Sequence, residues 1–236
     1  CCCKIWRPRV DLLRGELARG AAVQDSVVSA IHLPKVPSKM SPYAGGCLCV
    51  FDLDRTLTGA QEQTRKCHRN KVIEGISDEA YDGGALTLSE VGQGIGDTFC
   101  KDCYLGIISA WGVSGSAKRK EVQKSVKGIG ELPDPEEWSN ADDIRSPLIA
   151  GCGDRRKAKC VQGVVNWYGA RGIRTRPRNV YVFDDNKDAV LGLADYGFNF
   201  RQVSCASRDT RTANLTGYCG ARVAEIEQLQ GIHMCS

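Results

Sequence analysis

The sequence is poor in several features that would point to particular classes of protein. It contains no run of about 18 or more apolar residues, so we expect no transmembrane segment. Its 8 prolines are too few for a long proline-rich linker. Its 32 basic and 28 acidic side chains leave a net charge of only +4, without the basic excess typical of nucleic-acid-binding proteins. We therefore expect no nucleic-acid partner, whereas an anionic substrate would not be repelled.

What the chain does contain is ordinary for a globular protein. Its 236 residues, 42% hydrophobic and 25% charged, suffice for one α/β domain with a small insertion. The 26 glycines indicate many tight turns between short elements. We expect a soluble protein and slightly favour the cytoplasm, while the oligomeric state has no signature in the sequence. The chain begins with cysteine rather than methionine, as it would if its start were missing or processed.

Cysteine is unusually frequent, with 13 residues. Cys47 and Cys49 alternate with aliphatic residues in an apolar run, where any small hydrophobic residue would serve equally well. Cys100 and Cys103 have the spacing of zinc or redox sites, but no second pair at a suitable distance completes a zinc site. We interpret the cysteines as packing residues, and the redox compartment stays open.

The pattern of the chain changes near residue 45. Over 1–45, apolar residues at helical spacing precede a group of prolines and glycines, which predicts a helical lead-in and a connector. Over 46–236, short apolar runs alternate with helical patterns. The predicted strands are 47–53, 105–108, 147–150, 180–183 and 198–203, and the predicted helices are 161–168, 187–196 and 223–229, with an exposed helix and loop within 111–146.

This alternation predicts the fold class. Strands that are continuous apolar runs, separated by helices, are typical of a three-layer, Rossmann-like α/β fold with a mostly parallel central sheet. Ligands of such sheets bind beyond the carboxyl ends of the strands. Polar residues follow several of the predicted strands at these ends, so the functional residues should be sought there.

The strongest chemical signal follows the first predicted strand. The apolar run leads directly into two carboxylates, Asp52 and Asp54, with Thr56 two positions further on. Phosphate transfer to water needs a nucleophile, a proton donor for the leaving oxygen, and positive charge. An aspartate is ionised at neutral pH and forms a hydrolysable acyl phosphate. By itself, however, the pattern fits a strand end with two solvated aspartates equally well.

The spacing of Asp52, Asp54 and Thr56 resembles the Asp-x-Asp-x-Thr signature of the haloacid dehalogenase-like (HAD) hydrolases, and specifically of their phosphatase branch. The resemblance implies a HAD-like fold for residues 46–236. It implies that Asp52 is phosphorylated, that Asp54 is the general acid and base and ligates magnesium through its carbonyl, and that Thr56 helps to shape the turn. Members that dehalogenate carbon lack a carboxylate at the position of Asp54.

Two further elements of this family can be sought in order along the chain. Ser109 follows the run 105–108, and the resemblance implies that it hydrogen-bonds the phosphate. A lysine near a helix start should hold the charges of the nucleophile and the phosphate, and Lys157 and Lys159 are the candidates. Lys157 lies at helical spacing from the apolar positions of 160–165, so we favour Lys157 for the inward face.

An acidic cluster follows the run 180–183. Asp184 is in register with the family's metal ligand, so the resemblance implies that Asp52, Asp54 and Asp184 bind Mg²⁺, an ion that prefers hard oxygen ligands. Asp188 matches the family's second acidic position, which orients the lysine or the metal's waters. Asp185 is the alternative for this supporting role.

Substrate choice depends on a cap in this family, inserted after the first element or between the second and third. Residues 59–104, basic at first and then glycine-rich, form either a small cap or a solvated loop, and the sequence does not decide between them. A small cap would leave the site open to a phosphoprotein, and a folded cap would suit a phosphorylated small molecule.

Together these features predict a magnesium-dependent phosphatase that hydrolyses phosphomonoesters through an aspartyl-phosphate intermediate. Two alternatives remain open. One is a catalytically inactive HAD-fold binding or scaffold protein, and the other is a redox-responsive, cysteine-rich HAD protein.

Overall fold

The computed structural model describes residues 46–126, 128 and 132–236. The helical lead-in and connector predicted over 1–45 lie outside the described residues. No helix in the described ranges is long and apolar enough to cross a membrane.

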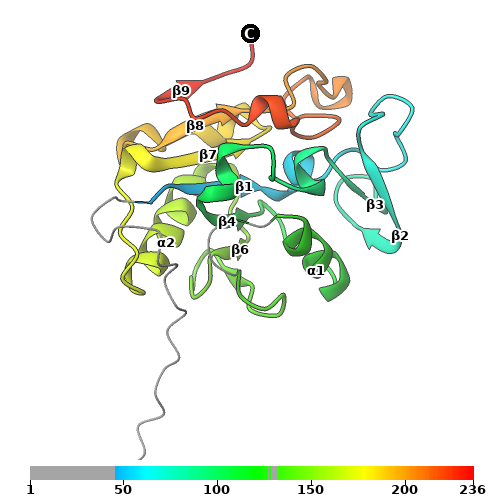
Figure 1. The fold of residues 1–236 in the computed structure, drawn as a ribbon. Helices are drawn as coiled ribbons and strands as arrows, with labels where there is room; N and C mark the ends of the chain where they lie inside the picture. The colour runs from blue at the N-terminus through cyan, green and yellow to red at the C-terminus, as the bar shows by residue number, and fades with distance from the viewer. Residues whose placement is uncertain (1–45, 127, 129–131) are drawn as a thin grey trace, which may run out of the picture. The chain divides into compact units, whose positions relative to one another are not determined.

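A seven-stranded sheet forms the centre of the described part of the chain. Every neighbouring pair of its strands is parallel (Figure 1). Its order is β5-β6-β4-β1-β7-β8-β9. The bounds are β1 Leu48–Asp52, β4 Tyr104–Ile108, β5 Ser139–Asn140, β6 Leu148–Ala150, β7 Val180–Asp184, β8 Asn199–Gln202 and β9 Ile232–His233. The predicted α/β class, parallel sheet and five strands are confirmed, whereas the short edge strands β5 and β9 were missed.

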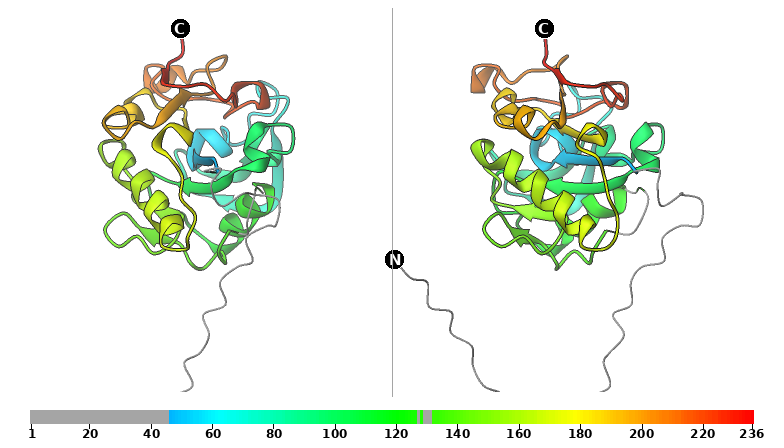
Figure 2. Two further views of the ribbon diagram at one scale, coloured as in Figure 1. Left: turned by 60° about the vertical axis from the view of Figure 1, so that its left-hand side comes forward. Right: turned by 90° about the vertical axis from the view of Figure 1, so that its left-hand side faces the viewer.

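Both faces of the sheet are covered, because alternate residues of its central strand enter two different hydrophobic clusters. Leu48 and Val50 of β1 pack in the cluster that contains the inner face of helix α2, Lys157–Gly169. Phe51 points to the other face, where the cluster includes Val122 of helix α1, Ser116–Ser125. Figure 2 shows α2 lying along one face of the sheet. Every residue of β1 is buried, as its continuous apolar run predicted.

Several connections are single helical turns rather than full helices. They are the π-helical turn Leu53–Leu57 and the 3₁₀ turns Val91–Gln93, Phe99–Asp102, Asp154–Arg156, Pro177–Asn179, Lys187–Val190, Ala194–Tyr196, Thr210–Thr212 and Val223–Glu225. The helix predicted over 187–196 is therefore two short turns, separated by Gly192 with a φ of 78°. The helix predicted over 223–229 was wrong beyond its first turn.

Residues 59–104 contain an antiparallel hairpin. Its strands are β2, Lys71–Asp78, and β3, Gly84–Leu88, which together form a separate two-stranded sheet. The hairpin lies alongside α1 (Figure 1). Most of β2 is exposed or half-buried, whereas Leu86 and Leu88 of β3 are buried in the core of the main sheet, so β2 forms the open side of the hairpin.

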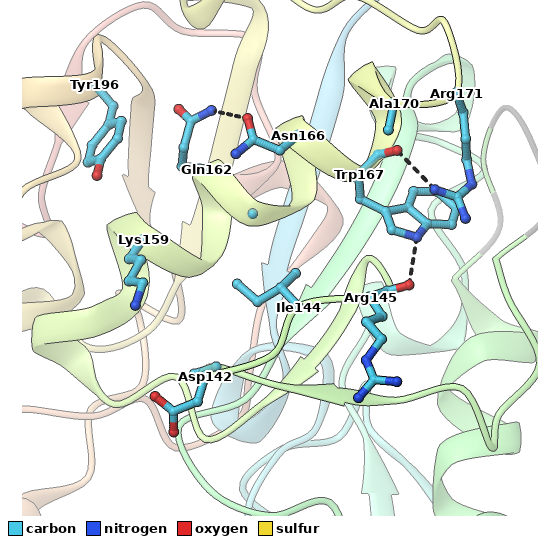
Figure 3. A pocket seen from close by; sticks show the side chains of 12 residues that line it. Asp142, Ile144, Arg145, Lys159, Gln162, Asn166, Trp167, Ala170, Arg171 and Tyr196 are labelled. Carbon is cyan, nitrogen blue, oxygen red and sulfur yellow. Dashed lines mark hydrogen bonds between the residues drawn. The ribbon is translucent and has the colours of Figure 1, made fainter.

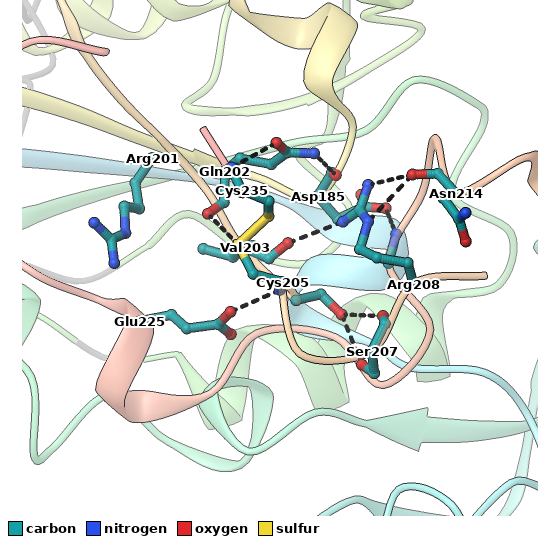
Figure 4. Close-up of a disulfide and its surroundings, with 12 residues drawn as sticks. Asp185, Arg201, Gln202, Val203, Cys205, Ser207, Arg208, Asn214, Glu225 and Cys235 are labelled. Atoms are coloured by element: carbon teal, nitrogen blue, oxygen red, sulfur yellow. Dashed lines mark hydrogen bonds between the residues drawn. A yellow bond between two sulfur atoms is a disulfide. The ribbon is translucent and has the colours of Figure 1, made fainter. Parts of the chain in front are cut away.

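The interpretation of the cysteines as packing residues was wrong for every cysteine that the structure describes. All of them form disulfides, namely Cys47–Cys103, Cys49–Cys100, Cys67–Cys219, Cys152–Cys160 and Cys205–Cys235. The C-x-x-C segment is therefore neither a zinc site nor a redox pair, because each of its cysteines is bonded to one that lies in or directly before β1. Figure 4 shows Cys205–Cys235, which joins the segment after β8 to the segment after β9.

Candidate active site

The carboxyl ends of three adjacent strands bring three of the predicted residues together. Asp52 ends β1, Asp184 ends β7, and Ser109 directly follows β4. Because β1 pairs in parallel with both neighbours, these residues lie at the same edge of the sheet. All three are buried.

The turn after β1 brings Asp54 back to this edge. The residues Leu53–Leu57 form one wide turn, in which the Thr58 N–H donates to the Leu53 carbonyl at 3.0 Å. Arg55 has a φ of 66° in this turn, a left-handed conformation that is uncommon without glycine. The Asp54 carboxylate then accepts a hydrogen bond from the Ser109 hydroxyl at 3.1 Å. Both predicted catalytic aspartates therefore lie beside the predicted phosphate-binding serine.

Thr56 lies inside the same turn and ties it to distant segments. Its carbonyl accepts hydrogen bonds from the Ser89 hydroxyl at 2.7 Å and from the Ala221 N–H at 2.9 Å. Its own hydroxyl is buried and has no hydrogen-bond partner among the described residues. Thr56 thus holds the turn through its backbone rather than through its side chain.

Lys157 reaches the centre of the site from the first turn of α2. Its ammonium group donates to the Asp52 carboxylate and, at 2.8 Å, to the Asp184 carboxylate. The side chain is buried among these acids, with 1% of its surface exposed. Its inward position agrees with the helical spacing in the sequence.

Lys159 points away from the site. It is exposed and lines a hollow of about 570 Å³ on the outer surface of α2, together with Gln162 and Asn166 (Figure 3). None of the predicted site residues other than this lysine lines that hollow. Of the two lysines that the sequence offered, only Lys157 contacts the carboxylates.

Three carboxylates at this edge could hold a metal ion. Asp52, Asp184 and Asp185 each offer an oxygen, and these oxygens lie within 4.8 Å of one another. The donors are hard and buried, which suits Mg²⁺ better than a softer ion. The Asp54 side chain is not in this cluster, so that residue could contribute only the carbonyl that the resemblance assigns to it.

The two candidates for the supporting acid lie in different places. Asp185 is buried in the cluster, where its carboxylate accepts a hydrogen bond from the Gly217 N–H. Asp188 is exposed, and its N–H donates to the Asn186 side chain at 3.0 Å in the turn after β7. The structure therefore brings the alternative, Asp185, to the site, whereas Asp188 lies in the turn Lys187–Val190, which Asn186 caps.

Burial and mutual repulsion shift the titration of these groups. Burial, and then the charge of Asp184, raises the pKa of Asp52 well above its usual value, although Lys157 opposes the shift. The same two causes raise the pKa of Asp185 to about 7. Burial lowers the pKa of Lys157, but Asp184 and Asp52 outweigh it and the net shift is upward. One lysine among three carboxylates leaves a negative excess that a divalent cation would neutralise.

Two residues of the site were missed in the sequence. Lys118 of α1 is buried and donates to Asp54 at 3.2 Å and to Asp78 of β2 at 2.5 Å. We expected this helix to be exposed, but Lys118 lies one turn before the buried Val122, on the same face. That helical spacing could have indicated that Lys118 is buried. Nothing in the sequence indicated Asp78, because the hairpin that presents it was not predicted.

No protein-family model matches the chain, and neither a curated protein nor a solved structure matches it. The assignment of a function therefore depends on the geometry of the site and on the motif itself.

Proposed function

We propose that the chain is a magnesium-dependent phosphomonoesterase of the HAD phosphatase branch, which works through an aspartyl-phosphate on Asp52. The observation that carries the proposal is the Lys157 ammonium held between the carboxylates of Asp52 and Asp184, at the ends of adjacent parallel strands. A buried carboxylate can approach an anionic phosphate only where fixed cations offset their repulsion. Lys157 supplies such a charge.

The chemistry divides into two displacements. In the first, an oxygen of Asp52 attacks phosphorus while the bond from phosphorus to the leaving oxygen breaks, and Asp54 gives a proton to that oxygen. In the second, Asp54 takes a proton from water, whose oxygen attacks the same phosphorus and restores Asp52. Ser109 and Lys157 donate hydrogen bonds to the phosphate throughout.

Asp52, Asp184 and Asp185, with the carbonyl of Asp54, would hold magnesium, which supplies positive charge to the phosphate oxygens when it is bound. The chain's own contribution is to fix the ligands. The Gly217 N–H orients Asp185, and the Asn186 N–H donates to Asp184 at 2.9 Å. These contacts fix the orientation of each carboxylate.

The proposal is tested by hydrolysis of p-nitrophenyl phosphate with magnesium, with EDTA, and by an Asp52→Asn variant. We expect EDTA to abolish turnover and Asp52→Asn to lower kcat by at least about a thousandfold, because the amide is no longer a nucleophile. The matched control is Asp195→Asn, an exposed aspartate of the turn Ala194–Tyr196, which should keep the wild-type rate. Thermal unfolding of each variant checks that the fold persists.

Turnover that survives in Asp52→Asn or in EDTA would contradict the proposal. If the folded, magnesium-loaded protein hydrolyses neither this ester nor a panel of phosphorylated metabolites and phosphopeptides, the inactive scaffold becomes the better explanation.

The disulfides bear on the compartment. Five disulfides in one chain are rarely maintained in the cytosol, where thiols are kept reduced. We propose that the protein works in an oxidising compartment, in place of the cytoplasm that composition slightly favoured. Because every cysteine of the described ranges is paired, a redox-responsive function of that part of the chain would have to proceed through reduction of one of these bonds.

A further inference from the structure

A cavity of about 440 Å³ opens directly beside Asp54. Its walls come from the turn of the β2–β3 hairpin, residues 79–81, and from Trp111, Gly112 and Ser114 in the segment that follows β4. Asp54 and Lys118 complete the lining. No other residue assigned to the phosphate or the metal contributes to it, so the cavity adjoins the reacting centre without being part of it.

The place of Asp54 in this lining indicates what the cavity holds. On the proposed function, on which this inference rests, Asp54 gives its proton to the leaving oxygen. A proton donor must lie within hydrogen-bond reach of the atom it protonates. The remainder of the leaving group then extends from Asp54 into the adjoining cavity.

Trp111 presents a free aromatic ring to this cavity. Its backbone is held on both sides, since its N–H donates to the Ser109 hydroxyl at 3.3 Å and its carbonyl accepts from the Gly151 N–H at 3.2 Å. The side chain is 73% exposed, more than any other large hydrophobic side chain that the structure describes. The indole makes no hydrogen bond, ring contact or cation contact with a described residue. An indole whose backbone is held beside the site and whose ring is left uncovered is suited to bind a ligand.

Tyr81 supplies a second ring from the hairpin. It has a φ of 54°, and its ring lies 4.3 Å from the Arg55 guanidinium, which holds it beside the turn after β1. The preceding residue, Ala80, is bound on both sides, by the Asp78 carboxylate at 3.0 Å and by the Gln61 amide at 3.0 Å. The hairpin turn is thereby fixed, and 45% of the Tyr81 surface stays exposed.

The charge of the lining limits the ligand further. Lys118 is the one cation among the lining residues, and it is already paired with Asp54 and Asp78. Glu79 adds an exposed carboxylate at the hairpin side. A leaving group with a second phosphate or a carboxylate would find no free positive charge here and would meet a negative one.

We propose that this cavity is the leaving-group subsite, and that it selects phosphomonoesters whose leaving group carries a planar, uncharged aromatic ring. Trp111 stacks on that ring, and Tyr81 contacts it from the hairpin. Aromatic stacking of this kind changes binding by about three- to tenfold, which sets the size of the expected selectivity.

The test compares benzyl phosphate with cyclohexylmethyl phosphate, two esters of similar size whose leaving oxygens both belong to primary alcohols. We expect the wild type to prefer benzyl phosphate by about fivefold in kcat/KM. Trp111→Leu should bring the ratio of the two esters close to one, and Trp111→Phe should keep most of the preference. The control is Tyr196→Leu, an exposed aromatic outside the cavity, which should leave the ratio unchanged.

A binding measurement separates failure of the subsite from failure of the proposed chemistry. Calorimetry with the non-hydrolysable benzylphosphonate and cyclohexylmethylphosphonate, in magnesium, should show the same preference and the same loss in Trp111→Leu. That result without turnover of either ester would overturn the proposed function and support the subsite. Turnover of both esters with no aromatic preference, or a preference that survives Trp111→Leu, would overturn the subsite. Absence of both turnover and selective binding would overturn both.

Discussion

Lys157 is the residue on which the charge balance of the site depends. Its ammonium contacts Asp52 and Asp184, and a third carboxylate, Asp185, lies within the same cluster. Buried charges of one sign are tolerated only where an opposite charge or a proton offsets them. Lys157 thus offsets buried negative charge in the fold and, on the proposed function, binds the phosphate.

Replacing Lys157 and its neighbour Lys159 one at a time should show that only Lys157 contributes to activity. We expect Lys157→Met to lower kcat/KM for p-nitrophenyl phosphate by about a hundredfold or more, because one fixed charge on the transferring phosphate is lost. Lys159→Met, on the exposed side, should stay within about twofold of wild type. Steady-state kinetics of the two variants test this prediction. An equal loss of kcat/KM in both would contradict the proposed phosphate-binding role of Lys157.

The raised pKa of Asp185 predicts a dependence of stability on pH. Its value in the folded protein is about 7, against 3.8 as the usual value, so the folded protein binds this proton more tightly than the unfolded chain does. The resulting stabilisation is complete below about pH 4 and is lost as the pH rises through about 7. In EDTA, the midpoint of thermal unfolding should therefore be higher at about pH 5.5 than at about pH 8.

Magnesium and a substitution serve as controls for this pH dependence. Magnesium should raise the unfolding midpoint more at the higher pH, where the carboxylates are ionised and able to bind it. Asp185→Asn should flatten the dependence in EDTA. A midpoint that rises from the lower to the higher pH in EDTA would contradict the assigned shift.

Among the elements, the segment that leads into α2 is the one that positions the lysine. It leaves β6, and the Cys152 N–H donates to the Ser109 carbonyl at 2.8 Å. The disulfide Cys152–Cys160 then closes a short loop around Lys157. Both cysteines are buried, so the bond joins two packed elements, the end of β6 and the first turn of α2. The disulfide thereby restricts where the helix, and hence its lysine, can begin.

Removing this disulfide should affect both stability and activity. The double variant Cys152→Ala and Cys160→Ala should lose about 2–3 kcal/mol of unfolding free energy, as expected for a short closed loop. Because the loop contains Lys157, kcat/KM should also fall, by about tenfold. The control is the double variant Cys47→Ala and Cys103→Ala. Both cysteines directly precede the amino ends of β1 and β4, away from the site, so this variant should lose stability but keep activity. Denaturant unfolding and kinetics on both variants test this, and unchanged activity in the first would contradict the positioning role.

For the molecule as a whole, disulfides connect segments that lie far apart in the sequence. Cys67–Cys219 spans 152 residues and joins the segment before the hairpin to the segment after β8. Cys47–Cys103 and Cys49–Cys100 both tie the start of β1 to the segment before β4. Such crosslinks reduce the entropy of the unfolded chain, and more so for longer loops. The fold should therefore depend on the oxidising conditions that maintain them.

Differential labelling of thiols checks this dependence. The denatured, unreduced protein is treated with iodoacetamide, then reduced and treated with N-ethylmaleimide, and peptides from residues 46–236 are analysed by mass spectrometry. We expect the ten cysteines of this range to carry only the second label, because all are paired. Reduction should also lower the unfolding midpoint, because the loss of all five disulfides removes several kcal/mol of unfolding free energy in total. The first label on most of them would instead support the earlier view that they are packing residues.

The sequence by itself determined five strands of the central sheet and the residues at their ends. A buried parallel strand needs a continuous apolar run, and the residue where that run stops must lie at the edge of the sheet. Asp52, Ser109 and Asp184 could therefore be placed without coordinates. The helical period likewise separated Lys157 from Lys159, since the face of a helix depends only on residues within two turns.

Only the tertiary structure decided the contacts between segments distant in the chain. The choice of Asp185 over Asp188, the salt bridges of Lys118 with Asp54 and Asp78, and the cysteine pairing all join residues that no local pattern relates. The hairpin escaped prediction because β2 is largely exposed and carries no apolar alternation. Local periodicity reflects which side of an element is buried, whereas the partner on the far side of the core is chosen by packing of the whole chain.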